Sequence, residues 1–350
     1  MPSPAPAVLP ARPNQQLPQH APLAVAVRDG LAESIHYGSV IATDHDGGTL
    51  LAAGDPFAPF YPRSSLKPLQ AVAMVRAGLD LPADLLALTA ASHSGSAAHI
   101  NGSRRILELH GLTPDALENS LDLPYGVAER EEWLRNGGPA TRLTQNCSGK
   151  HASMAATCVI NGWPVKGYLD PGHPLQQLVA VTVAELTGEQ SSTVSTDGCG
   201  TPLFALTLRG MATAFGTIAK AAADAGTATD GAAPGPEAAV GLAMSRHPEM
   251  VAGERRDVTE LMRLAPGFVA KDGFEGVQLV GLPDGRAVAV KISDGGDRAR
   301  MPVTVRALEA LDVDTSVLAP IATVAVLGGG RNVGTFQALD FLSTPVNEAR

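Results

Sequence analysis

The sequence predicts a protein of the mixed α/β (α+β) class, and three observations support this. Short runs with β character lie near both ends of the chain, at residues 23–27 and 321–327. Helical patterns fill much of the part between them, as at residues 207–225. An apolar content of 45% with 17% charged residues is that of a globular protein, and 350 residues allow two or three domains or lobes.

The N-terminal segment differs in composition from the rest. Residues 1–22 are rich in Pro, Gln and Ala, so we expect a flexible tail without a secretion signal. No run reaches the roughly eighteen apolar residues of a membrane span. Three cysteines, an odd number, fit reduced thiols better than a disulfide framework. We therefore expect a cytoplasmic protein, and its net charge of −9 argues against nucleic acid as the main partner.

Turn residues separate the predicted elements. Residues 39–42 and 49–53 are predicted to be the arms of a hairpin around the turn at 44–48. A helix is predicted from Ser64 or Ser65 to Gly78, with Pro68 in its first turn, where a missing amide hydrogen is tolerated. The other predicted elements are helices near 99–110, from 113–115 onward, through 152–156, and at 207–225, 237–245 and 258–264, strands at 277–282 and 287–292, and a final helix near 301–311.

Ser64 and Lys67 form the first candidate catalytic pair. Their spacing of three residues is close to one helical turn, so a helix places the hydroxyl and the amine on one face. A serine hydroxyl needs a base to take its proton at neutral pH, and a lysine held away from water can act as that base. The same spacing is also common on solvated helix faces, so the pair alone is weak evidence.

The scarcity of lysine strengthens this hypothesis. Only six of the 26 basic residues are lysine, and arginine provides the surface charge elsewhere. Arginine keeps its proton, so a site that needs a neutral amine must use lysine. The lysines beside Ser, Gly, Cys or Asp clusters are therefore candidates for function, namely Lys67, Lys150, Lys271 and Lys291.

A second group of hydroxyls follows the apolar run at residues 85–91. Residues 92–96 read Ser-His-Ser-Gly-Ser. One interpretation is a polar turn that caps the next helix. The other is a second hydroxyl that faces Ser64 and relays a proton or binds substrate.

Two cysteines provide a candidate metal site. Thiolates are the soft ligands that zinc prefers. Cys147 and Cys199 could therefore share a Zn²⁺ with His151, Asp197 or a neutral Lys150. Ordinary buried thiols are the alternative, because the spacing is not that of a paired zinc motif. The G-x-x-x-x-G-K pattern of a phosphate loop is absent, so nucleotide binding is rejected.

Taken together, these clusters resemble the asparaginase II family of Ser-Lys-dependent L-asparaginases. The matching segments keep the family order over roughly residues 23–312 and read RSSLKPLQ (63–70), ASHSG (91–95), NCSGKHA (146–152), DGCG (197–200), HPEMVAG (247–253) and KDGFEG (271–276). The resemblance implies a fold related to serine β-lactamases and glutaminases, with a sheet flanked by helices and a helical lobe. It also implies a single catalytic domain over residues 23–345, with the site between its two lobes, and a homodimer.

The resemblance implies catalytic roles for particular residues. It makes Ser64 the nucleophile and Lys67 its base. It adds a second Ser-Lys pair, in which Lys271 faces a serine of the turn at 92–94. Segment lengths favour Ser92 as the partner of Lys271, and Ser94 is the alternative.

Metal and substrate ligands are also implied. The resemblance places a zinc ion on Cys147, Lys150 and Cys199, with Asp197 close by, and leaves the chemistry to the Ser-Lys pairs. Lysine is an unusual zinc ligand because it must lose its proton to bind.

The substrate's α-amino and α-carboxylate groups are assigned to Arg63, Asp197 or the zinc, with Ser94 as a further substrate-binding candidate. Phe274 stands where alanine is frequent in the family, so its ring is expected to narrow the pocket near Lys271.

The predicted activity is hydrolysis of L-asparagine to L-aspartate and ammonia through an acyl-enzyme. Two alternatives stay open. Another Ser-Lys amidohydrolase, of the glutaminase or penicillin-recognising type, would share the catalytic pair. A non-catalytic zinc-binding protein would use Cys147 and Cys199 as structural ligands and Ser64 as a helix cap.

Overall fold

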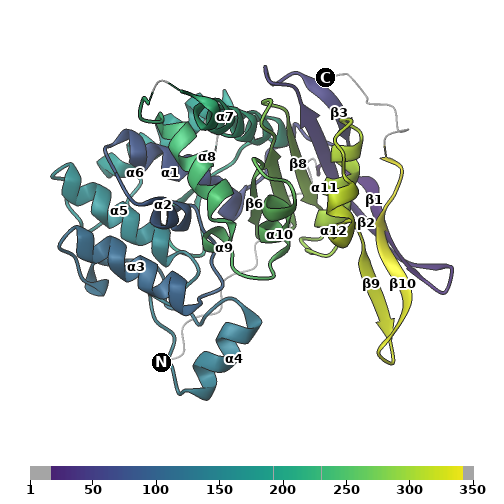
Figure 1. The fold of residues 1–350 in the computed structure, drawn as a ribbon, viewed down its shortest axis with the longest axis horizontal. Helices are drawn as coiled ribbons and strands as arrows, with labels where there is room; N and C mark the ends of the chain where they lie inside the picture. The colour runs from purple at the N-terminus through teal and green to yellow at the C-terminus, as the bar shows by residue number, and fades with distance from the viewer. Residues whose placement is uncertain (1–16, 192, 230, 342–350) are drawn as a thin grey trace.

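The protein consists of an antiparallel sheet with helices on both faces and a lobe of helices beside it (Figure 1). The computed structural model describes residues 17–191, 193–229 and 231–341. This architecture confirms the predicted α/β class, with a sheet flanked by helices and a helical lobe.

The sheet joins both ends of the described chain. Its eight antiparallel strands follow the order β6-β7-β8-β2-β1-β10-β9, and β3 pairs with β2. The strands are β1 (Ala21–Arg28), β2 (Leu31–Thr43), β3 (Thr49–Ala53), β6 (Val269–Gly273), β7 (Val277–Gly281), β8 (Ala287–Ile292), β9 (Val324–Gly328) and β10 (Arg331–Ala338). Strands β4 (Val194–Thr196) and β5 (Pro202–Phe204) form a separate hairpin.

Helices α7 (Leu208–Thr227) and α11 (Arg300–Glu309) cover opposite faces of the sheet. Side chains alternate between the two faces of a strand. On β7, the backbone at Gly281 approaches α7 so closely that a Cβ there would lie 2.1 Å from the Phe215 carbonyl oxygen. Gln278 lies on the other face, where its side chain accepts a hydrogen bond from Arg300 of α11. Both faces of the central strands are therefore buried.

The helical lobe lies on the opposite side of the β6 edge from the β9–β10 hairpin (Figure 1). Its helices are α1 (Lys67–Arg76), α2 (Ala83–Thr89), α3 (Ala97–Leu109), α4 (Val127–Arg135), α5 (Ser148–Ile160) and α6 (Pro174–Thr187). Helices α8 (Pro236–Arg246), α9 (Pro248–Val251) and α10 (Asp257–Leu264) connect the lobe and α7 with β6. Buried Ala, Leu, Val and Met side chains form one continuous core through both parts.

Several boundaries differ from the sequence predictions. Strand β1 begins at Ala21, inside the range predicted as tail, while residues 1–16 lie outside those described. The helix predicted from residue 113 onward is one 3₁₀ turn, Pro114–Ala116. The helix near 301–311 is not the last element, since α12 (Ala319–Ala322), β9 and β10 follow it.

The most consequential difference concerns β6. The sequence predicted Lys271 in a segment before a strand, but Lys271 and Asp272 lie within β6 itself. Adjacent charged residues are rare in a buried strand, so propensity argued against this element. The turn to β7 comes after them, at Glu275 and Gly276, which both have φ of +68°.

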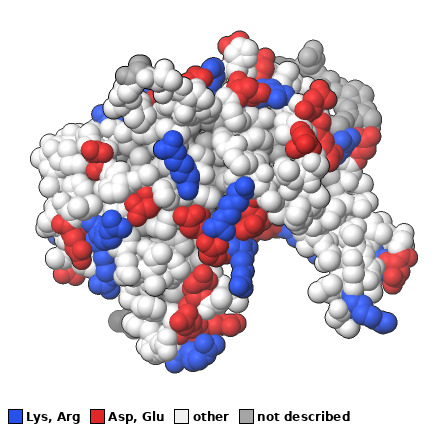
Figure 2. Space-filling view, in the orientation of Figure 1, with Lys and Arg blue, Asp and Glu red and all other residues white. Residues whose placement is uncertain are grey.

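The surface carries charges of both signs. On the face drawn in Figure 2, acidic and basic side chains are interspersed. Ion pairs such as Arg263 to Glu254, at 2.7 Å, join them. Of the helices in the described ranges, none combines the length and the apolar character needed to cross a bilayer.

Candidate active site

Ser64 lies on a tight turn at the start of α1. The 3₁₀ helix Arg63–Leu66 leads directly into α1, and Pro68 stands in the first turn of α1. Arg63 has a φ of +53°, in the left-handed region that a side chain with a Cβ rarely adopts. Such backbone strain is often found at functional sites. The predicted position of Ser64 at a helix start is confirmed, and its side chain is buried.

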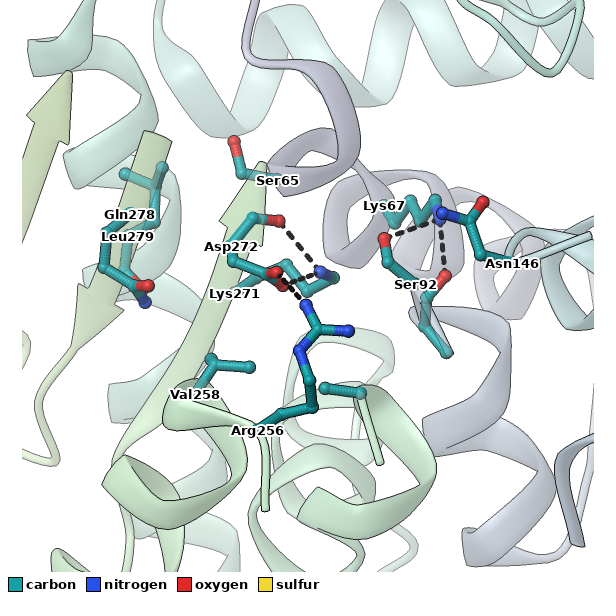
Figure 3. Close-up of polar contacts among 12 residues, drawn as sticks. Ser65, Lys67, Ser92, Asn146, Arg256, Val258, Lys271, Asp272, Gln278 and Leu279 are labelled. Carbon is teal, nitrogen blue, oxygen red and sulfur yellow. Dashed lines mark hydrogen bonds and ion pairs between the residues drawn. The ribbon is translucent and has the colours of Figure 1, made fainter. Parts of the chain in front are cut away.

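Lys67 connects α1 with the turn after α2. Its Nζ donates hydrogen bonds to the Ala91 carbonyl oxygen at 2.5 Å and to Ser92 Oγ at 2.8 Å (Figure 3). From the sequence, Lys67 is predicted to pair with Ser64, and Lys271 is predicted to face the turn at 92–94. In the structure Lys67 forms its side-chain hydrogen bond with Ser92.

Lys271 projects from β6 beside a carboxylate. Its Nζ donates to the carbonyl oxygen of Asp272 at 2.8 Å and to the Asp272 carboxylate (Figure 3). Burial penalises the ammonium form and lowers the pKa of Lys271 to about 8, although Asp272 opposes this shift. The nearby charge of Lys67 lowers that pKa further. Lys271 is therefore partly neutral at slightly alkaline pH.

Asp272 is held ionised by three cations. Burial alone would raise its pKa, but Lys271, Arg256 and Arg300 hold the pKa well below its usual range. Arg256 Nη2 donates to Asp272 Oδ2 at 2.7 Å. The site therefore keeps a fixed negative charge next to a lysine that can lose its proton.

A narrow pocket brings the two candidate serines together. Its lining is Ser64, Ser92, Tyr125, Arg256, Asp272, Gly273, Phe274 and Asp297. The cavity volume is about 10 Å³, room for roughly one water molecule. Phe274 is 45% exposed and lies edge-on to Tyr125, with 5.6 Å between ring centroids. Phe274 is therefore part of the pocket lining, and its effect on the width of the pocket stays a prediction.

The predicted substrate-binding residues are not in the lining of this pocket, although Arg63 Cζ lies 5.8 Å from the centroid of the Phe274 ring. Arg63 Nε donates to Asp197 Oδ1 at 2.9 Å, so the two are paired with each other. Ser94 Oγ donates to the Ala252 carbonyl oxygen at 3.0 Å. None of the three lines the pocket, and of the serines in the turn it is Ser92 that joins Ser64 there.

The candidate metal ligands form a second buried cluster. Cys147 precedes α5, Lys150 lies in its first turn, and Cys199 lies in the turn between β4 and β5. Lys150 Nζ lies 3.2 Å from Cys199 Sγ and donates to Thr201 Oγ1 at 2.9 Å. The structure therefore brings together two thiols and an amine that are far apart in the sequence.

The charges in this cluster differ between the two thiols. Cys147 and the Lys150 ammonium hold the pKa of Cys199 well below its usual range, while Cys199 and burial raise the pKa of Cys147. Although burial opposes it, the two thiols raise the pKa of Lys150.

The donor set of the cluster fits zinc only if lysine takes part. Within the described ranges, no three His, Cys, Asp or Glu side chains lie together as metal ligands. Cys147, Cys199 and Lys150 supply two sulfurs and a nitrogen, which are donors that zinc accepts. The adjacent His151 is buried, and its Nε2 has no hydrogen-bond partner among the described residues. Its pKa is lowered by burial, which keeps a nitrogen lone pair available.

Sequence reasoning missed three residues of the pocket: Tyr125, Arg256 and Asp297. Arg256 comes three residues after the segment 247–253, and no motif distinguishes it from the adjacent Arg255. Tyr125 lies in the long connection between α3 and α4, just before α4 begins at Val127. Only the tertiary fold brings these side chains to the serines.

A larger cavity of about 320 Å³ lies away from this site. It is bounded by α3, α4 and the loop before α5, and its lining includes Ile100, Trp133 and Leu143. Its lining contains no serine, whereas two serines line the small pocket. The small pocket at Ser64 is therefore the stronger candidate for amide chemistry.

Two serines in one pocket, with buried lysines beside them, define a class of protein: a Ser-Lys amidohydrolase. The comparisons with known proteins agree with that class. The chain belongs to the L-asparaginase II family, whose match extends over residues 24–338. The resemblance seen in the sequence motifs is thereby confirmed for nearly the whole chain.

A search of solved structures also gave matches of low identity. One is a beta-lactamase from Mycobacterium bovis, with a TM-score of 0.35 and 16% identity, covering 79% of this chain and 95% of that one. Another is a protein named Mglu, with a TM-score of 0.34 and 15% identity, covering 79% of this chain and 67% of that one. No curated protein sequence matches the chain. The family assignment therefore rests on the match to the L-asparaginase II family over residues 24–338.

Proposed function

We propose that the protein is an L-asparaginase that hydrolyses L-asparagine to L-aspartate and ammonia. The observation that carries the proposal is the pocket shared by Ser64 and Ser92, with the amine of Lys67 bonded to Ser92. Membership of the L-asparaginase II family supports amide hydrolysis as the reaction. The preference for asparagine over glutamine is part of the proposal, and it follows the name of the family.

In this mechanism, Ser64 attacks the side-chain amide carbon of the substrate. Lys67 accepts its proton in the neutral form, and Ser92 Oγ, hydrogen-bonded to Lys67, relays the proton between them. The protonated base then gives a proton to the departing ammonia. Water hydrolyses the resulting aspartyl ester and regenerates Ser64. Lys271, with its pKa of about 8, is the proposed acceptor of the proton that this water loses, and a proton returns to Ser64 Oγ as the ester breaks.

Zinc has a supporting role in this proposal. Cys147, Lys150 and Cys199 would hold the ion, since they are the sulfur and nitrogen donors that the fold brings together. A bound zinc would supply positive charge near the substrate. The acyl-transfer steps are assigned to Ser64, Ser92, Lys67 and Lys271.

An ammonia assay tests the function. The purified protein should release ammonia from L-asparagine faster than from L-glutamine, and nitrocefin should not be hydrolysed. Preferred turnover of L-glutamine or nitrocefin would assign the pocket to another Ser-Lys hydrolase. If none of the three is hydrolysed and chelation unfolds the protein, the non-catalytic zinc-binding alternative holds.

A further inference from the structure

Arg256 lies in the pocket with only part of its guanidinium paired. Its Nη2 donates to Asp272 Oδ2 at 2.7 Å, and its Cζ lies 4.8 Å from the centroid of the Tyr125 ring. The ion pair fixes one end of the planar group, and the aromatic face supports it from one side. The guanidinium is therefore held in one orientation before any ligand binds.

The other end of the guanidinium has an unused donor. Nη1 of Arg256 is buried and has no hydrogen-bond partner among the described residues. Figure 3 shows this end directed away from Asp272, toward the side of the site where Ser92 lies. A buried donor without a partner costs free energy, so its retention calls for an explanation in a ligand.

The chemistry of that ligand follows from the donor. Guanidinium groups bind carboxylates through parallel N–H donors, with geometry that an ammonium cannot match. Arg256 and the two serines line the same pocket, so Nη1 is a donor available to a substrate that reaches Ser64. We propose that Arg256 binds the α-carboxylate of the substrate and so selects amides that carry one. This inference rests on the proposed amide hydrolysis.

Arg63 is the competing candidate for this contact. Its Nε is already bonded to Asp197 at 2.9 Å, and neither residue lines the pocket. Arg256, in contrast, combines a place in the pocket with an unpaired N–H. If Arg63 binds the carboxylate, substitution of Arg63 removes carboxylate recognition. If Arg256 binds it, substitution of Arg256 does so.

The test compares Arg256→Gln with the unchanged protein on three amides. L-Asparagine carries both α groups, succinamic acid keeps the carboxylate without the amine, and β-alaninamide keeps the amine without the carboxylate. We expect kcat/KM for the first two to fall about ten- to hundredfold, the range of a hydrogen bond to a charged group. The value for β-alaninamide should change less than about threefold, since it never used that contact.

Matched variants separate recognition from damage to the fold. Arg256→Lys keeps the charge without the forked donors and should recover only part of the loss. Arg255→Gln removes an exposed charge one residue away and should change no substrate's kcat/KM. An equal loss on all three amides in Arg256→Gln, or carboxylate-selective loss in Arg63→Gln instead, would overturn the proposal.

A binding measurement keeps this inference separate from the hydrolysis itself. Calorimetry with L-aspartate and with β-alanine, which lacks the α-carboxylate, needs no turnover. Arg256→Gln should weaken L-aspartate binding about ten- to hundredfold and leave β-alanine binding unchanged. If no amide is hydrolysed but this selectivity is found, the proposed function fails and the assignment of Arg256 stands. Equal affinities in both proteins overturn the assignment.

Discussion

Two buried lysines, Lys271 in β6 and Lys150 in α5, show how neighbours decide the chemistry of the same side chain. Both are fully removed from water, and burial by itself lowers the pKa of each. Around Lys271, Asp272 does not offset this penalty, and the pKa falls to about 8. Around Lys150, the two thiols more than offset it, and the pKa rises. Burial alone therefore does not make a base.

The reason lies in how the neighbouring charges are shared. The Asp272 carboxylate accepts hydrogen bonds from both Arg256 and Lys271, so Lys271 shares this negative charge with a second cation. Lys67 adds a further repulsive charge at Lys271. Cys199 lies 3.2 Å from Lys150 and has a lowered pKa, so its negative charge favours the ammonium. The first region suits proton transfer, whereas in the second the Lys150 ammonium is stabilised by the neighbouring thiols, and zinc would have to displace its proton.

The largest expected effect is the loss of the nucleophile, which tests whether the pocket region performs the catalysis. Ser64→Ala removes the nucleophile and should lower the rate of ammonia release from L-asparagine by about a thousandfold or more. Ser65→Ala is the matched control, because Ser65 Oγ donates to the Pro62 carbonyl oxygen and Ser65 does not line the pocket. It should stay within about tenfold of the unchanged protein. Turnover at the normal rate in Ser64→Ala would remove Ser64 from the mechanism.

The next effect tests the pKa of Lys271. A base must be neutral to accept a proton, so kcat/KM should rise with pH and level off above about 8. Lys271→Arg should remove this rise and lower the plateau by about a hundredfold. Asp272→Asn removes a charge that raises the pKa of Lys271, so the rise should move to lower pH.

A second lysine provides the control for these pH profiles. Lys291→Arg replaces a lysine that donates to the Glu275 and Ile292 carbonyl oxygens, and it should leave the profile unchanged. A profile that keeps its rise near pH 8 in Lys271→Arg would show that another group is the titrating base.

A smaller effect concerns the thiol cluster. Zinc that binds only the folded protein should stabilise it by about 2.7 kcal/mol when free zinc is about 100 times its dissociation constant. The midpoint of thermal unfolding, together with metal analysis, measures this gain. Cys199→Ser should abolish it, and Cys158→Ser, a buried thiol on α5 outside the cluster, should preserve it. An unchanged midpoint with zinc would contradict the proposed ligands.

The smallest expected effect concerns the width of the pocket. Phe274→Ala removes a ring at the rim, so the ratio of L-glutamine to L-asparagine turnover should rise by about tenfold, the effect of roughly one methylene group. Phe57→Ala, which removes a 52% exposed ring away from the pocket, should not change the ratio. An unchanged ratio in Phe274→Ala would mean that Phe274 does not limit substrate length.

Much of the site was predictable because its signals are local. Ser64 and Lys67 are three residues apart at a helix start, and the scarcity of lysine drew attention to Lys271. The strands β6 and β10 were missed because local sequence features do not indicate them. β6 contains a buried Lys-Asp pair that strand propensity disfavours. β10 lies beyond the last predicted run, and its pairing with β1 depends on contacts between the two ends of the chain.

The sequence by itself determined the class of fold, the family and the set of reactive side chains, because periodicity, turn residues and short motifs are written in neighbouring positions. The tertiary structure alone decided the pairings. It joined Lys67 to Ser92, bound Arg63 to Asp197, and placed Arg256 in the pocket. These contacts cross tens to hundreds of residues, and the desolvation that lowers the pKa of Lys271 exists only once the core has closed around it.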